Sequence, residues 1–105
     1  MKGNLLNLMG RTANAITGVQ LLLLYRKVED SEEYVKGFIS IKEEEIKEAF
    51  YFLIPEAQEA IIAKFSQAQN ILKDDGKIHR NEDELLVTLR NLFSMMDALV
   101  SLSIR

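Results

Sequence analysis

Apolar residues recur every three or four positions along the last quarter of the chain. Five of them follow spacings of four and three, the pattern of one face of a helix: Leu85, Leu89, Leu92, Met96 and Leu99. A second row, seven residues apart, lies beside the first: Leu86, Phe93 and Val100. Asn81 and Glu84 have the spacing of a helix N-cap and the residue that completes a capping pair. The pattern predicts a helix over residues 82–104.

The middle of the chain carries a similar series, which Pro55 interrupts without changing its helical spacing. Proline clashes with the preceding turn of a helix but is tolerated at the first helical position. We therefore expect two helices, over residues 41–53 and 55–73. One continuous helix with a kink at the proline is the alternative.

Polar residues mark the ends of these two helices. Ser40 followed by Glu43 is a capping-box pattern for a start at residue 41. Gly76 is expected to end the second helix in the left-handed conformation, which glycine adopts readily. The polar stretch 74–81, which holds the single histidine, His79, is then a loop.

The first segment predicts a helix over residues 4–28 that is apolar around most of its circumference. Helices of this kind usually lie in the centre of a core. Gly10 and Gly18 lie inside it, and they either permit the close approach of another helix or mark a bend. Residues 29–39 follow. We expect them to cover the end of the bundle, either as the start of a further helix or as a short strand. Only five glycines and one proline punctuate the chain, so we predict an all-α fold, a compact bundle of about four helices in one domain, 1–105.

Composition narrows the chemistry. The chain has no cysteine, which excludes disulfides and thiolate metal sites and fits a cytoplasmic location. Residues 1–28 contain four basic side chains and no acidic one, but their longest uncharged run, Thr12 to Tyr25, is only 14 residues. A helix needs roughly 20 apolar residues to span a bilayer, so no membrane span is expected.

A cluster of glutamates is the sharpest candidate for chemistry. Glu44 and Glu48 lie one helical turn apart and can present both carboxylates to a divalent cation. With Glu45 they give the stretch 44–48, which resembles the first half of the glutamate motif in the all-helical nucleotide pyrophosphohydrolases related to MazG. That resemblance implies a magnesium-dependent nucleotide hydrolase. It covers five residues, and the second half of the motif, a glutamate and an aspartate three apart on a later helix, is absent from residues 60–77. The alternative is that these glutamates are the solvated first turn of a helix.

Basic residues near one end of the bundle suggest nucleic-acid binding as an alternative function. Lys73, Lys77, Arg80 and Arg90 can contact phosphates of a nucleic acid. The net charge of −3 and the acidic neighbours of these residues weigh against this function.

Apolar residues exceed what four short helices can bury. The consecutive aromatics Phe50, Tyr51 and Phe52 cannot all point into one narrow core. We expect Tyr51, Phe52, Met95 and Leu102 to form apolar surface for association. The sequence therefore favours a non-enzymatic interaction or assembly protein that self-associates or binds a partner protein. It indicates no catalytic residue and no cofactor.

Overall fold

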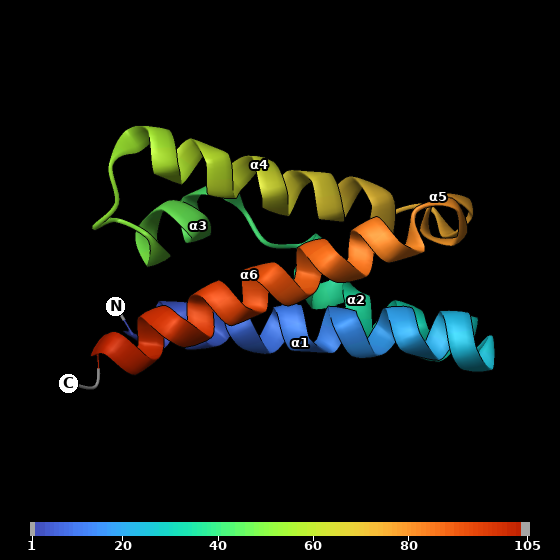
Figure 1. Ribbon diagram of the computed structural model, residues 1–105. Helices are drawn as coiled ribbons and strands as arrows, with labels where there is room; N and C mark the ends of the chain where they lie inside the picture. The colour runs from blue at the N-terminus through green and yellow to red at the C-terminus, as the bar shows by residue number, and fades with distance from the viewer. Residues whose placement is uncertain (1, 104–105) are drawn as a thin grey trace.

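The computed structural model describes residues 2–103 as six α-helices, with no strand in that range (Figure 1). The helices are α1 (Lys2–Tyr25), α2 (Val28–Ile39), α3 (Glu43–Ala49), α4 (Pro55–Leu72), α5 (Asp75–Arg80) and α6 (Glu82–Ser103). The fold is all-α, as the sequence predicts. The four predicted helices correspond to α1, α3, α4 and α6, and position 104 lies outside the described residues.

Two helices appear where the sequence left other readings open. Residues 29–39 form α2 rather than a strand, because Val35 and Phe38, three residues apart, are both buried on one helix face. The stretch 74–81, predicted to be a loop, contains the short helix α5. Its Ile78 is only 1% exposed, and the Asp74 carboxylate accepts a hydrogen bond from the Gly76 N–H at 2.8 Å.

The helix boundaries differ from the predicted ones at both ends of α1 and α3, and by one residue at the end of α4. α3 ends at Ala49, not at residue 53. α3 begins at Glu43, not at residue 41, because Glu45 rather than Glu43 closes the first turn: its carboxylate accepts the Lys42 N–H at 2.8 Å. α1 ends at Tyr25, where Arg26 takes a left-handed φ of 54° and turns the chain into α2. Gly76 does not adopt that conformation. No described glycine has a positive φ, and α4 ends through the right-handed Lys73.

The interruption at Pro55 is a true break between two helices, and the kinked alternative is wrong. α4 starts at Pro55, and residues 50–54 form a non-helical connection. The Gln58 side chain donates a hydrogen bond to the Phe50 carbonyl at 2.8 Å, which fixes this connection against the first turns of α4.

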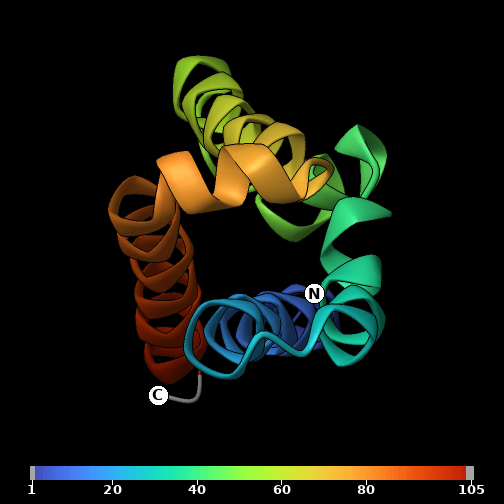
Figure 2. The ribbon, with the colours of Figure 1, turned by 90° about the vertical axis from the view of Figure 1, so that its right-hand side faces the viewer.

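The helices surround one apolar core about an axis that runs along the molecule (Figure 2). α2 folds back along α1, and α6 lies along another side of α1. α4 lies across the core from α1. In Figure 2, α6 forms the left-hand edge of the molecule. Phe38 of α2 and Phe65 of α4, both fully buried, stack with ring centroids 5.5 Å apart and join the two sides of the core.

Gly18 sits where α1 and α2 approach most closely. A Cβ atom built on it would lie 2.8 Å from Val35 Cγ1 and 3.1 Å from the Ser31 carbonyl oxygen. A Cβ on Gly10, on the exposed side of the same helix, would meet nothing within 4 Å. The sequence allowed either the close approach of another helix or a bend at these glycines. Gly18 permits the close approach of α1 and α2. α1 continues through Gly10 as helix.

The two glycines give a matched prediction. Gly18→Ala should lower the free energy of unfolding by about 1–2 kcal/mol, because the new methyl group must displace the Val35 side chain and the Ser31 carbonyl of α2. Gly10→Ala should raise it by up to about 1 kcal/mol, because alanine favours the helix over glycine. Urea denaturation followed by circular dichroism measures both, and equal effects of the same sign would contradict the assignment.

Candidate interaction surface

Beyond its acidic first turn, which contains Glu82, Asp83 and Glu84, the exposed side of α6 has few charges. Between Val87 and Leu102 its solvent-exposed residues form what we call the α6 face: Val87, Arg90, Asn91, Ser94, Asp97, Ala98, Ser101 and Leu102. Only Arg90 and Asp97 are charged. Val87 is 55% and Leu102 63% exposed, so this helix buries one side and leaves apolar groups on the other.

A groove lies next to the α6 face. α4 and α6 are joined near one end by a hydrogen bond from Gln67 to Glu84 at 2.5 Å, and from there they diverge toward the start of α4 (Figure 1). The space between them is a groove of about 220 Å³. Its apolar lining includes Ile61, Leu92 and the half-buried Met95.

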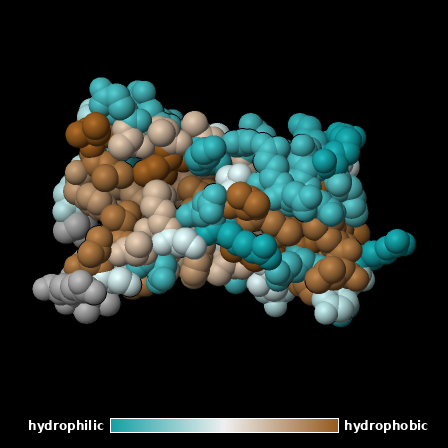
Figure 3. All heavy atoms as spheres, in the orientation of Figure 1, coloured by the Kyte–Doolittle hydropathy of each residue, from teal (hydrophilic) through white to brown (hydrophobic). Residues whose placement is uncertain are grey.

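The connection between α3 and α4 adds exposed apolar side chains at the same end of the molecule. Tyr51 is 54%, Phe52 45% and Ile54 66% exposed, whereas Phe50 is fully buried. Tyr51 and Phe52 lie edge to face, with centroids 5.6 Å apart. The expectation that the three consecutive aromatics cannot share one core is confirmed. Figure 3 shows apolar side chains gathered over the half of this side where α6 ends and α4 begins, and hydrophilic ones over the α5 end.

Three of the four predicted interface residues, Tyr51, Phe52 and Leu102, are therefore exposed, and Met95 lines the groove. Their role in association stays a prediction. The sequence did not single out Val87, although it continues the spacing of Ser94 and Ser101 by one heptad. It also did not single out Leu24, which is 70% exposed at the far end of α1.

Residues Glu82–Leu102 are also long and apolar enough to cross a membrane by length and composition, with 28% of the most apolar window buried. Core helices of soluble proteins meet the same criteria. In this fold Leu85, Leu89 and Met96 of α6 are fully buried against the rest of the chain, and Arg90 and Asp97 would be costly inside hydrocarbon.

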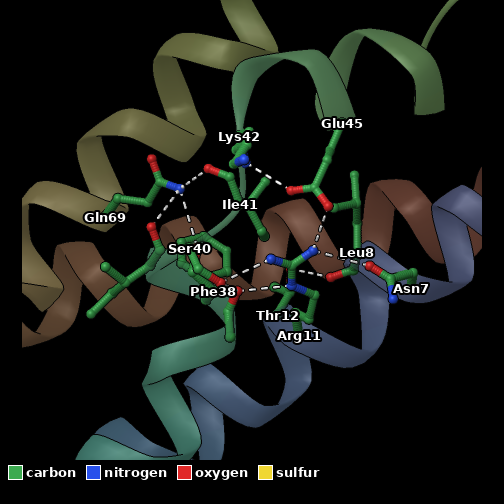
Figure 4. A network of polar contacts seen from close by, with 12 residues as sticks. Asn7, Leu8, Arg11, Thr12, Phe38, Ser40, Ile41, Lys42, Glu45 and Gln69 are labelled. Carbon is green, nitrogen blue, oxygen red and sulfur yellow. Dashed lines mark hydrogen bonds and ion pairs between the residues drawn. The ribbon is translucent and has the colours of Figure 1, made fainter.

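Arg11 is the centre of the main polar network (Figure 4). Its guanidinium donates to the Gly37 carbonyl at 2.8 Å, to the Ser40 hydroxyl at 3.0 Å, and to the Asn7 side chain at 3.1 Å. It also forms an ion pair with the Glu45 carboxylate at 3.0 Å. Nearby, the Gln69 amide of α4 donates to the Phe38 and Ile41 carbonyls at 3.1 and 2.9 Å. The network fixes the connection between α2 and α3 to both α1 and α4.

This network also decides what the glutamate cluster can do. The hydrogen bond from the Lys42 N–H and the contact with Arg11 lower the pKa of Glu45 from its ordinary value of 4.5, against an opposing effect of partial burial. Both carboxylate oxygens of Glu45 already have partners, while Glu44 and Glu48 are exposed. Within residues 2–103 no group of three or more His, Asp or Glu side chains is placed to hold a metal ion. The arrangement stabilises the fold, and it provides no preformed magnesium site.

The basic candidates do not form one patch. Lys73, Lys77 and Arg80 are exposed around α5, whereas Arg90 lies on the α6 face. Lys73 borders a second, open groove of about 1030 Å³ between α2 and the α4–α5 turn. Glu32, Glu33 and Asp74 line the same groove, so its charges do not select a phosphate.

Comparisons of this chain with protein-family models, with curated proteins and with solved structures found no match.

Proposed function

We propose that this protein is a non-enzymatic helical interaction or assembly protein, and that it associates with a second copy of itself through the α6 face and the adjoining α4–α6 groove. The observation that carries the proposal is that the α6 face is weakly charged and lies beside an apolar groove, with the exposed Val87 and Leu102 at its two ends. A helix that buries one face normally carries many charges on the other. Here that other face has one basic and one acidic side chain over four turns.

The amount and position of exposed apolar surface support association. Large apolar side chains scattered singly over a surface need no explanation, but a contiguous patch beside a groove is typical of an interaction site. Leu102, near the end of α6, and the aromatic pair of the α3–α4 connection lie toward the end of the molecule over which Figure 3 shows apolar side chains (Figures 1 and 3), and Met95 lines the groove. The second copy is favoured over an unrelated partner because the two charges of the α6 face complement the same face of another molecule.

Light scattering coupled to size-exclusion chromatography tests the proposal. We expect a species of about 24 kDa at micromolar concentration, twice the 12.0 kDa of one chain, which dissociates on dilution. Leu102→Glu should raise the dimer dissociation constant at least about tenfold, because a charge replaces an apolar side chain in the interface.

Leu24 supplies the matched control. It is 70% exposed, like Leu102, but lies at the opposite end of the molecule. Leu24→Glu makes the same chemical change and should leave the dissociation constant unaltered. A 12 kDa species at every accessible concentration would refute self-association. Equal weakening by both variants would refute the location.

The nucleotide hydrolase and the nucleic-acid-binding module remain weaker predictions. The first is supported only by the five residues 44–48, and the second only by the exposed lysines and arginine around α5.

A further inference from the structure

Arg90 and Asp97, the two charged residues of the α6 face, can form an ion pair with each other only between two molecules. Arg90 and Asp97 are seven residues apart, two helical turns, and lie on the same edge of the face. At a rise of 1.5 Å per residue their positions differ by about 10.5 Å along the helix, too far for an ion pair within α6. In the part of the chain that the structure describes, neither takes part in an ion pair.

The uncharged residues of the face follow a heptad pattern. Val87, Ser94 and Ser101 are spaced by seven, and Asn91 and Ala98 lie between them, so that the spacing alternates between four and three. This is the spacing by which one helix packs along another at a shallow angle. α6 is also the outermost element on this flank, so a second helix can reach it (Figure 2).

We infer that two copies pair through antiparallel α6 helices about a two-fold axis near Ser94, so that Arg90 of each copy forms an ion pair with Asp97 of the other. The inference rests on the proposed function and specifies its geometry. An axis midway between residues 90 and 97 places each Arg90 at the height of the other copy's Asp97, and the two-fold symmetry produces the contact twice. A parallel two-fold pairing would instead place Arg90 and Asp97 of one copy on the opposite edge of the contact from those of the other copy, so that neither charge would meet its complement.

Charge reversal tests the ion pairs. Arg90→Asp and Asp97→Arg should each weaken the dimer about tenfold, because each creates two like-charge contacts in place of two attractive ones. The double variant Arg90→Asp/Asp97→Arg restores opposite charges at both contacts and should return the dissociation constant to within about twofold of wild type. Added salt should weaken the wild-type dimer and should strengthen the dimers of the single variants.

Matched controls separate this effect from general charge. Lys77→Asp and Glu33→Arg make corresponding changes at exposed sites away from the α6 face. Both should leave the dissociation constant unaltered, and circular dichroism should show that all variants keep their helix content.

Cross-linking tests the direction and register. Because the chain has no cysteine, each single-cysteine variant reports one position. Ser94→Cys should form a disulfide-linked dimer on mild oxidation, since the two Ser94 positions lie about 1.5 Å apart along the axis. Val87→Cys and Ser101→Cys should not, since each is separated from its own counterpart by about 20 Å along the axis.

The outcomes distinguish the two levels of the proposal. A monomeric wild type would refute the proposed function and the pairing with it. A dimer that is insensitive to Arg90→Asp and Asp97→Arg would refute this pairing and leave self-association standing. Disulfides at all three positions would overturn the antiparallel arrangement in favour of a parallel one, and disulfides at none of them would place the interface elsewhere.

Discussion

Replacing Phe65 with alanine should lower the free energy of unfolding by about 3–5 kcal/mol. The ring is fully buried and stacks on Phe38, with centroids 5.5 Å apart. It therefore supplies apolar contact between α2 and α4, which the hydrogen bond from Gln69 to the Phe38 carbonyl also joins. Because a domain of this size has a total stability of only about 5–15 kcal/mol, the variant should be close to the limit of folding.

Urea denaturation of monomeric protein measures this change, with Phe52→Ala as the control. Phe52 is 45% exposed, so the same truncation there should change the free energy of unfolding by less than about 1 kcal/mol. If Phe65→Ala is too unstable to purify, Phe65→Leu should retain the fold with a smaller loss. A loss below about 1 kcal/mol for Phe65→Ala would show that the stacked pair does not hold the two sides of the core together.

Replacing Arg11 with methionine should lower the free energy of unfolding by about 2–3 kcal/mol. This is the second largest effect on stability that we expect. Methionine replaces the unbranched apolar stem of the side chain but not the guanidinium, so the hydrogen bonds to Gly37, Ser40, Asn7 and Glu45 are lost. The Gly37 carbonyl lies near the C-terminal end of α2. The positive charge of Arg11 there interacts favourably with the partial negative charge at that end of the helix dipole. Arg80→Met, at an exposed position of α5, should change the stability by less than about 0.5 kcal/mol.

The pH dependence of stability identifies the contribution of Glu45. Its pKa in the folded protein lies below the ordinary value of 4.5, so ionised Glu45 stabilises the fold. That contribution is fully present above the unfolded value and is lost as the pH falls through the lower, folded value. Glu45→Gln should therefore be less stable than wild type at neutral pH, and the difference should disappear below the folded pKa. A difference that is independent of pH would show that the carboxylate charge has no part in the network.

Local patterns were sufficient for the long helices. The rows beginning at Leu85 and Leu86 are buried or half-buried along α6, and Pro55 begins α4 as its ring geometry requires. The short helices were harder to predict. α5 contains one buried apolar residue, Ile78, and one such residue defines no period.

The polar network lay beyond sequence reasoning because its members are distant in the chain. Arg11 contacts residues 26 to 34 positions away, and no local pattern pairs them. One signal was present: Arg11 is the only charge between Asn4 and Tyr25, inside an otherwise uncharged helix. A lone arginine in such a helix needs buried or half-buried acceptors, and the end of α2 provides them. The candidate surface was easier to predict, because the sequence itself shows more apolar positions than the helices can bury.

The pairing of α1 with α6 also has a consequence during protein synthesis. α1 meets α2 as soon as the next fourteen residues have been made, but its side toward α6 gains its cover only with residues 82–103. While the ribosome adds the intervening helices, that apolar strip remains open to solvent and to other nascent chains. The growing polypeptide is therefore more prone to aggregate before α6 emerges than after α6 has packed on α1.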